Sequence, residues 1–298
     1  MLSYYKDFLA HYYSTNDQRY QYLLSAGEKI LLDCPGELET LIEDFHQNGY
    51  QIKSSVEQRK ALAQKAGIEF YTLNYVFLAC ASKKTYADYL KKGYTEDLFY
   101  ETFEDLSYKL EECKEVKGVW GNFVEFWYPI FYRMDCFKLG RLEFEVIAYP
   151  KDEPTTFGDV TLKKGDFILS VHIPSGAPLT KEARMESYRL AYYFFPQCIY
   201  EGKLVMICDS WLMFPSNREI FPPSSNIHQF LDDWHILQSR EDPDYHDCWR
   251  LFGQVYQGDP NALPQNTGAR RAMVSWLKQG KYSGTGLGLA LFDGESLI

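Results

Sequence analysis

Residues 167–180 read Phe-Ile-Leu-Ser-Val-His-Ile-Pro-Ser-Gly-Ala-Pro-Leu-Thr and decide the fold of the region around them. The apolar first half predicts a strand, the Pro and Gly residues predict a loop, and Thr180 can cap a helix over 181–195. The first N–H groups of a helix have no partner within it and lie at the positive end of its dipole, so this loop could hold a pyrophosphate. Alternatively, Ser175 and Gly176 only turn the chain, because many strand-to-helix connections contain glycine and bind nothing.

Strand-like runs flank this stretch on both sides. Residues 204–208 (Leu-Val-Met-Ile-Cys) form a continuous apolar run, which is typical of a strand buried on both faces. Residues 160–162 and 167–173 surround a turn in which Gly165 can supply a positive φ, and this predicts an antiparallel hairpin. The other elements predicted here are strands over 119–126, 127–132, 142–149, 234–237 and 286–292, a polar loop over 151–158, and helices over 227–230 and 268–278.

The first part of the chain predicts helices instead. Apolar residues recur at intervals of three and four from Leu2 to Tyr13, which places them along one buried stripe. Ser54, with Glu57 three residues later, has the pattern of a capping box. The predicted helices cover 2–13, 37–47, 54–67, 69–92 and 96–117, the last opened by Thr95 and closed by Gly118. Five helices predict a compact bundle over 1–118, followed by a second domain over 119–298.

Composition and charge exclude several classes of protein. The formal net charge is −10 and the basic residues occur only as isolated pairs, so we predict no nucleic-acid partner. No apolar run reaches the roughly 18 residues of a membrane span, and the N-terminus lacks the pattern of a signal peptide, so we predict no membrane association. The seven cysteines are odd in number and contain no CxxC pair, which favours a reducing, cytoplasmic location.

Several segments together resemble a known family. These are 139–145 (Leu-Gly-Arg-Leu-Glu-Phe-Glu), 172–180, Glu186-Ser187, 208–212 (Cys-Asp-Ser-Trp-Leu) and 223–227 (Pro-Ser-Ser-Asn-Ile). They resemble a group of bacterial GNAT-like N-acyltransferases, and the preceding helices look like the N-terminal helical domain of those proteins. The resemblance implies an α+β or α/β fold, in which an N-terminal helical bundle is followed by a GNAT-like mixed sheet flanked by helices. It also implies a V-shaped opening between residues 169–173 and 204–208, where an acyl-CoA lies and an amine attacks the thioester.

The resemblance further implies a cosubstrate and the residues that bind it. The cosubstrate would be acetyl-CoA or another acyl-CoA, and the acceptor would be a small-molecule or peptide amine. The residues that would contact coenzyme A are Ile173, Ser175, Gly176, Ala177, Leu179 and Thr180. The usual phosphate loop of this family has Gln or Arg followed by two spaced glycines, whereas here Gly176 and Ala177 stand between two prolines.

Acyl transfer to an amine needs a base, because an ammonium has no lone pair, and an acid for the leaving thiolate. His172 is the candidate base, since it ends the strand beside the expected opening and an imidazole ordinarily titrates near pH ~6.5. It could equally be a structural histidine bonded to a neighbouring carbonyl. Ser210 could donate to the thiolate, or it could cap a turn. Cys208 lies in an apolar run and is interpreted as a buried, inert thiol rather than a nucleophile.

Two other patterns could suggest different chemistry. Residues 284–288 (Gly-Thr-Gly-Leu-Gly) resemble a phosphate loop, but only ten residues follow, so a glycine-rich final strand is the better interpretation. His235, His246 and Cys248 match no standard zinc spacing, so we predict no metal site.

Two hypotheses about function therefore stay open. The first is an acyl-CoA-dependent N-acyltransferase, in which the amine attacks the thioester directly. The second is a catalytically silent ligand-binding or interaction protein that kept the sheet and filled its opening with aromatic side chains. Tyr and Phe number 24 and 20 in this chain, so the second hypothesis has material to draw on.

Overall fold

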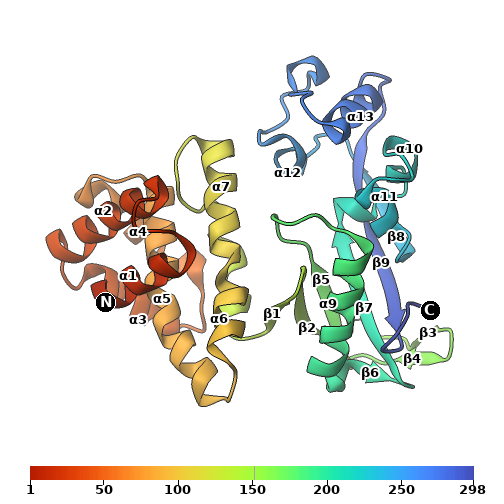
Figure 1. The fold of residues 1–298 in the computed structure, drawn as a ribbon, viewed down its shortest axis with the longest axis horizontal. Coiled ribbons are helices and arrows are strands. Elements are labelled where there is room, and N and C mark those ends of the chain that lie inside the picture. The colour runs from red at the N-terminus through yellow and green to blue at the C-terminus, as the bar shows by residue number, and fades with distance from the viewer. Residues whose placement is uncertain (151) are drawn as a thin grey trace. The chain divides into compact units, whose positions relative to one another are not determined.

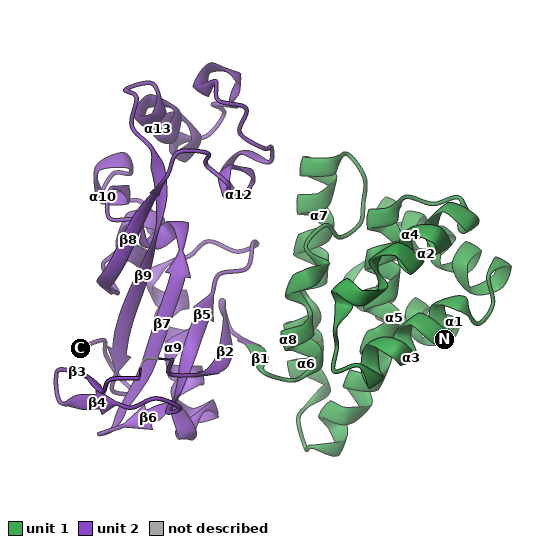
Figure 2. Ribbon diagram, turned by 180° about the vertical axis from the view of Figure 1, so that it is seen from behind, with its two compact units in different colours: residues 1–137 green, residues 138–298 purple. Residues whose placement is uncertain are grey.

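The computed structural model describes residues 1–150 and 152–298. The chain forms two compact units, residues 1–137 and 138–298, shown in two colours in Figure 2. The first unit thus ends at Phe137, beyond the boundary expected at residue 118.

The first unit is helical, and α5 lies at its centre (Figure 1). This helix contacts α1, α2, α3, α4, α6 and α7, and most of its residues between Thr72 and Ser82 are fully buried. The bounds in this unit are α1 Leu2–Tyr12, α2 Gln18–Asp33, α3 Glu37–Gln47, η1 Ile52–Ser55, α4 Val56–Ala66, α5 Phe70–Lys91, α6 Glu96–Phe103, α7 Asp105–Lys117, η2 Glu125–Trp127 and α8 Pro129–Tyr132.

Three details of the helical prediction are wrong. The helix over Gln18–Asp33 was missed, and the single helix expected over 96–117 is two helices that meet at Glu104. The capping box is also wrong, because the Ser54 hydroxyl donates to the carbonyl of Gln51 at 2.6 Å and α4 begins two residues later.

The strands predicted between residues 119 and 132 are wrong: residues 119–124 are irregular, and the helical turns η2 and α8 follow them. Their aromatic side chains pack on the helices rather than in a sheet: the Tyr132 hydroxyl donates to the carbonyl of Leu78 at 2.6 Å. The backbone of this segment also contacts α5, since the N–H of Asn122 donates to the carbonyl of Tyr71 at 2.8 Å. These contacts attach the segment to the helical unit, and they explain why that unit extends past the expected boundary.

The second unit is built on a mixed sheet, as expected. Its strand order is β1-β2-β5-β7-β9-β8, with β6 paired to β7. β5 and β7 are parallel, whereas the β2–β5, β7–β9 and β8–β9 pairs are antiparallel. The bounds are β1 Cys136–Leu139, β2 Leu142–Ala148, β5 Phe167–His172, β6 Ile199–Tyr200, β7 Lys203–Ser210, β8 His235–Asp242 and β9 Ser283–Phe292.

The predicted hairpin between residues 160–162 and 167–173 is wrong in its pairing. β4 (Val160–Leu162) pairs with β3 (Thr155–Phe157) in a separate two-stranded sheet, while β5 pairs with β2. Gly165 does adopt the expected positive φ, at 90°. The predicted loop over 151–158 therefore contains β3, and its first residue, 151, lies outside the described residues.

The two faces of the sheet are covered differently. The helix α9 (Lys181–Phe194) packs on the face that carries Phe144 and Phe292, here called the α9 face. The opposite face carries Glu145, Ser170 and Ile207 and is called the hairpin face, because β3 and β4 pack on part of it. The buried cluster under that hairpin consists of Tyr149, Val160, Leu162, Ile168, Val205, Leu289 and Leu291.

The connection between β8 and β9 forms a small helical layer with its own core. It contains α12 (Cys248–Phe252) and α13 (Gly268–Leu277), which pack with α10 (Asn217–Ile220) and near α11 (Asn226–Leu231). Gly280 has a φ of 74° just after α13, as expected for a helix end.

Candidate active site

The sheet is open between the ends of β5 and β7. The two strands share only two Cα partner pairs, of which the last is Ser170 with Ile207. Beyond that pair each strand keeps its outer partner, β5 as far as His172 and β7 as far as Ser210. The lost pairing is therefore a local opening inside the sheet, where backbone groups of adjacent parallel strands face each other without a ladder.

His172 lies at the edge of this opening and is bonded to a carboxylate. Its Nε2 is 3.0 Å from Oε2 of Glu145 on β2, and the two side chains are 22% and 19% exposed. The partner in this bond is thus a carboxylate, not the backbone carbonyl considered as the alternative for His172. Because an ionised carboxylate only accepts, it favours the tautomer with hydrogen on Nε2, which leaves Nδ1 as the basic nitrogen of the neutral ring.

Ser210 and His172 lie on opposite faces of the sheet. Side chains alternate along a strand, so His172 shares the hairpin face with Ser170, and Asp209 shares it with Ile207. Ser210 therefore belongs to the α9 face, where its Oγ accepts the N–H of Leu212 at 3.2 Å and caps the turn η4 (Trp211–Met213). The turn-capping alternative for Ser210 is thus observed, and the opening has one candidate group on each side.

Cys208 is fully buried, and burial raises the pKa of its thiol far above the ordinary value. A thiolate is the nucleophilic form of cysteine, so this residue is unsuited to carry an acyl group. Its interpretation as an inert core residue agrees with the structure.

The glycine-rich run near the C-terminus belongs to β9 and is not a phosphate loop. A Cβ on Gly286 would lie 2.2 Å from the carbonyl oxygen of Met213, and one on Gly288 would lie 3.0 Å from the Cβ of Trp234. Alternate glycines thus let η4 and Trp234 lie directly on the α9 face of β9. On that face, η4 and Trp234 therefore cover this part of β9.

The loop over Ile173–Thr180 connects the opening to α9. Ser175, Gly176 and Ala177 are exposed, and Gly176 has a φ of 118°, a conformation open to glycine and strained for other residues. The Nε of Arg141, which follows β1, donates to the carbonyl of Ala177 at 2.6 Å and braces the loop. Exposed backbone at a glycine turn before a helix of 14 residues fits a phosphate group.

The first turn of α9 also contains an acidic side chain. The carboxylate of Glu182 accepts its own backbone N–H and the Thr180 hydroxyl, and these hydrogen bonds lower its pKa. The hydroxyl of Thr180 in turn accepts the N–H of Ala183 at 3.3 Å. A phosphate at this helix end would displace the Glu182 carboxylate or be repelled by it.

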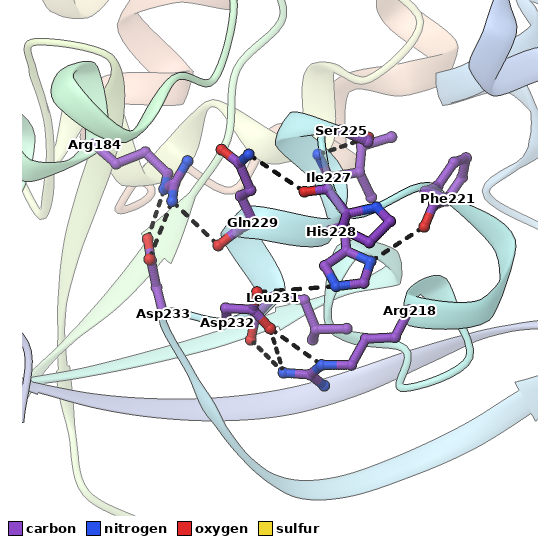
Figure 3. Close-up of polar contacts among 11 residues, drawn as sticks. Arg184, Arg218, Phe221, Ser225, Ile227, His228, Gln229, Leu231, Asp232 and Asp233 are labelled. Atoms are coloured by element: carbon purple, nitrogen blue, oxygen red, sulfur yellow. Dashed lines mark hydrogen bonds and ion pairs between the residues drawn. The ribbon is translucent and has the colours of Figure 1, made fainter.

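A buried ion pair anchors the other end of the loop (Figure 3). Arg184 is 1% exposed, and its Nε lies 2.6 Å from Asp233, which follows α11. The same guanidinium donates to the carbonyl of Leu179 at 2.9 Å and to that of Gln229 at 3.1 Å. Tyr188 adds a bond to the Asp233 carboxylate at 3.1 Å. Of this network only Leu179 lies in a resemblance segment, so sequence reasoning missed the pairing of Arg184 with Asp233.

The residues weighed as zinc ligands are used otherwise. His235 is exposed on β8, Cys248 is buried in α12, and His246 bonds Asp242 at 2.8 Å. Across residues 1–150 and 152–298, no group of three His, Cys, Asp or Glu side chains is placed to hold a metal ion.

Two family models match the chain. The model described as the GNAT-like C-terminal domain matches residues 136–290, and the model described as the N-acyltransferase N-terminal domain matches residues 11–134. The chain belongs to the GNAT-like family and carries both domains in this order. No curated protein sequence matches it significantly.

Solved structures of similar fold include acyltransferases. An acyltransferase in complex with decanoyl-CoA has a TM-score of 0.65 and 22% identity, over 90% of this chain and 86% of the other. An acyltransferase in complex with decanoyl-CoA and teicoplanin has a TM-score of 0.62 and 21% identity, over 85% of this chain and 75% of the other. These likenesses confirm the predicted fold. Within the described residues, no helix is both long and apolar enough to cross a membrane.

Proposed function

We propose that this protein is an acyl-CoA-dependent N-acyltransferase whose thioester lies in the opening between β5 and β7. The observation that carries the proposal is the opening itself, with the His172–Glu145 pair on one face and a glycine-containing helix-cap loop at its end. The two family domains and the acyl-CoA in the similar solved structures support the same activity.

The loop supplies the binding site for acyl-CoA in this proposal. Backbone groups of Ile173, Ser175, Gly176 and Ala177 would approach the pyrophosphate and pantetheine, and those of Leu179 and Thr180 would complete the turn. The N-terminus of α9 favours an anion, and a phosphate there would take the place of the Glu182 carboxylate. Decanoyl-CoA in similar structures makes medium-chain acyl groups worth testing beside acetyl.

The proposed reaction uses both faces of the opening. On the hairpin face, Nδ1 of His172 takes a proton from the acceptor ammonium, while Glu145 stabilises the imidazolium that forms. The freed nitrogen lone pair attacks the thioester carbon and forms the C–N bond. The C–S bond then breaks and its electron pair goes to sulfur, while the second proton lost by the attacking nitrogen replaces the proton that Ser210 gives to the thiolate.

Ser210 would donate to the leaving sulfur from the α9 face. Its oxygen accepts from Leu212, and a hydroxyl that accepts still has one hydrogen to donate. The products are an amide, the coenzyme A thiol and one released proton.

The proposed acceptor is a small-molecule amine. Two solved structures of this fold hold teicoplanin or 10C-teicoplanin, which makes aminated small molecules the first class to screen. Peptide amines form the second arm of the same screen.

The test combines binding with turnover. Isothermal titration should give one saturable site for decanoyl-CoA or acetyl-CoA, and Gly176→Val should weaken it, because the new side chain is strained at this φ. His172→Gln should lower kcat by roughly 100-fold in an assay of thiol release, in the range expected for loss of a general base, without changing the affinity for acyl-CoA. Absence of binding at millimolar acyl-CoA would favour the silent interaction protein instead.

A further inference from the structure

The side chain of Asp209 is not used by the reaction described above. It is exposed at the end of β7, and among residues 1–150 and 152–298 its carboxylate has no hydrogen-bond or ion-pair partner. Its neighbours Cys208 and Ser210 point to the other face, where one is buried and the other caps η4.

The register of the sheet places Asp209 opposite His172 across the opening. Ser170 and Ile207 form the last pair of β5 and β7. His172 lies two residues after Ser170, and Asp209 lies two residues after Ile207. Both therefore point to the hairpin face, on the two edges of the opening. Glu145 pairs with Ser170 and lies on the same face, where it bonds His172.

The two faces of the opening are not equally accessible beside β7. On the α9 face, Met213 lies directly against Gly286 of β9, where even a Cβ would meet its carbonyl oxygen at 2.2 Å, so an acceptor amine cannot approach over β9 from that face. On the hairpin face, Asp209 pairs with Leu287, which in turn pairs with the exposed Gln238 on β8. The acceptor amine therefore meets the row formed by Asp209, Leu287 and Gln238.

The charge on this face selects the acceptor. Glu145 and Asp209 are both carboxylates, while the basic residue placed further along β8, Arg240, donates to Thr285 at 3.0 Å. These two carboxylates attract the ammonium group of an acceptor. They repel an acceptor that carries its own carboxylate next to the amine.

We infer that Asp209 positions the acceptor ammonium for His172, so that this enzyme takes amines that are cationic around the reacting nitrogen and rejects α-amino acids. The inference rests on the proposed N-acyltransferase function. Asp209 holds the ammonium, and His172 removes its proton, so Asp209 acts on binding of the acceptor more than on the chemical step.

The test uses steady-state kinetics of the 298-residue chain at saturating decanoyl-CoA. The probes are 2-phenylethylamine, which is a monocation, and phenylalanine, which has the same ring and amine plus a carboxylate. Asp209→Asn should raise KM for 2-phenylethylamine by about tenfold and change kcat by less than about threefold, because a binding contact is lost before the chemical step. For the parent protein, kcat/KM should be lower for phenylalanine than for 2-phenylethylamine. In Asp209→Asn the two kcat/KM values should lie closer together.

A matched control separates position from overall charge. Glu201→Gln removes one exposed carboxylate from the turn before β7, at the other end of the same strand. It should leave both KM values unchanged. Equal KM values for the parent and Asp209→Asn proteins, or the same change in Glu201→Gln, would overturn the inference while acyl transfer itself stands.

A second measurement keeps the two proposals distinguishable. Should the parent protein transfer no acyl group to any amine, the proposed function fails, and titration with 2-phenylethylamine then decides the role of Asp209. Binding that Asp209→Asn weakens about tenfold supports an ammonium site in a protein without turnover. Binding that is absent, or equal in both proteins, contradicts the site.

Discussion

Replacing Asp233 with Asn should destabilise the C-terminal unit strongly, because it leaves the Arg184 guanidinium buried without its counter-charge. The two side chains are 1% and 8% exposed, and two bonds of 2.6 and 3.1 Å join them. Breaking a buried pair of this kind by removing one partner costs about 3–5 kcal/mol. For a unit of this size that corresponds to a fall in Tm of about 6–20 °C.

The neighbouring residue provides the control. Asp232 pairs with Arg218 at 3.0 Å, but these side chains are 53% and 40% exposed, so water already solvates the charges (Figure 3). Asp232→Asn should therefore cost less than about 1 kcal/mol.

Calorimetry of the two variants side by side checks the reasoning, with the transition of the C-terminal unit followed separately because two units need not unfold together. A fall in Tm of less than about 3 °C for Asp233→Asn, or equal falls for both variants, would refute it. Since the same guanidinium bonds the carbonyl of Leu179, Asp233→Asn should also weaken binding of acyl-CoA at temperatures where the unit is folded.

Two further predictions concern stability. Gly286→Ala should lower the free energy of unfolding in urea by about 1–3 kcal/mol, because its Cβ would overlap the backbone oxygen of Met213. Gly268→Ala, which has open space around it, should be neutral or stabilising. Equal effects of the two substitutions would contradict the packing of Met213 on β9. The hydrogen bond to Asp242 raises the pKa of His246, so its contribution to stability is present below the unfolded pKa near ~6.5 and is lost as pH rises through the folded value. His246→Gln should therefore lower Tm more at pH 5.5 than at pH 8.5, and an equal difference at both pH values would count against this ion pair.

Local signals predicted much of the second unit. The strand over 204–208 is correct because a continuous apolar run of that length has few alternatives, and the helix after Thr180 is correct because its cap and helix formers agree. The prediction of strands between 119 and 132 was wrong because the local signals there are ambiguous. Dense aromatics suit a strand or a packed turn equally, and the contacts with the distant α5 decided between them.

The candidate site was predicted in part. The sequence pointed to His172 and to the loop before α9, but its carboxylate partner Glu145 lies 27 residues away and is visible only from the register of β2 against β5. Asp209 and Ser210 are adjacent in the chain, so sequence alone could not say which of them faces the base. A shift of one residue in strand register exchanges the two faces.

Local patterns were enough to predict most of the helical first part and the strand–loop–helix around Gly176, because caps, glycines and apolar periodicity act over a few neighbouring residues. The family was indicated by the resemblance segments. The tertiary structure was needed to show that β5 and β7 are parallel and separate after two pairs, that β9 needs its glycines to admit Met213, and that the buried Arg184 connects the loop to α11. These features depend on partners distant in the chain, which the fold brings within a few ångströms and no local pattern encodes.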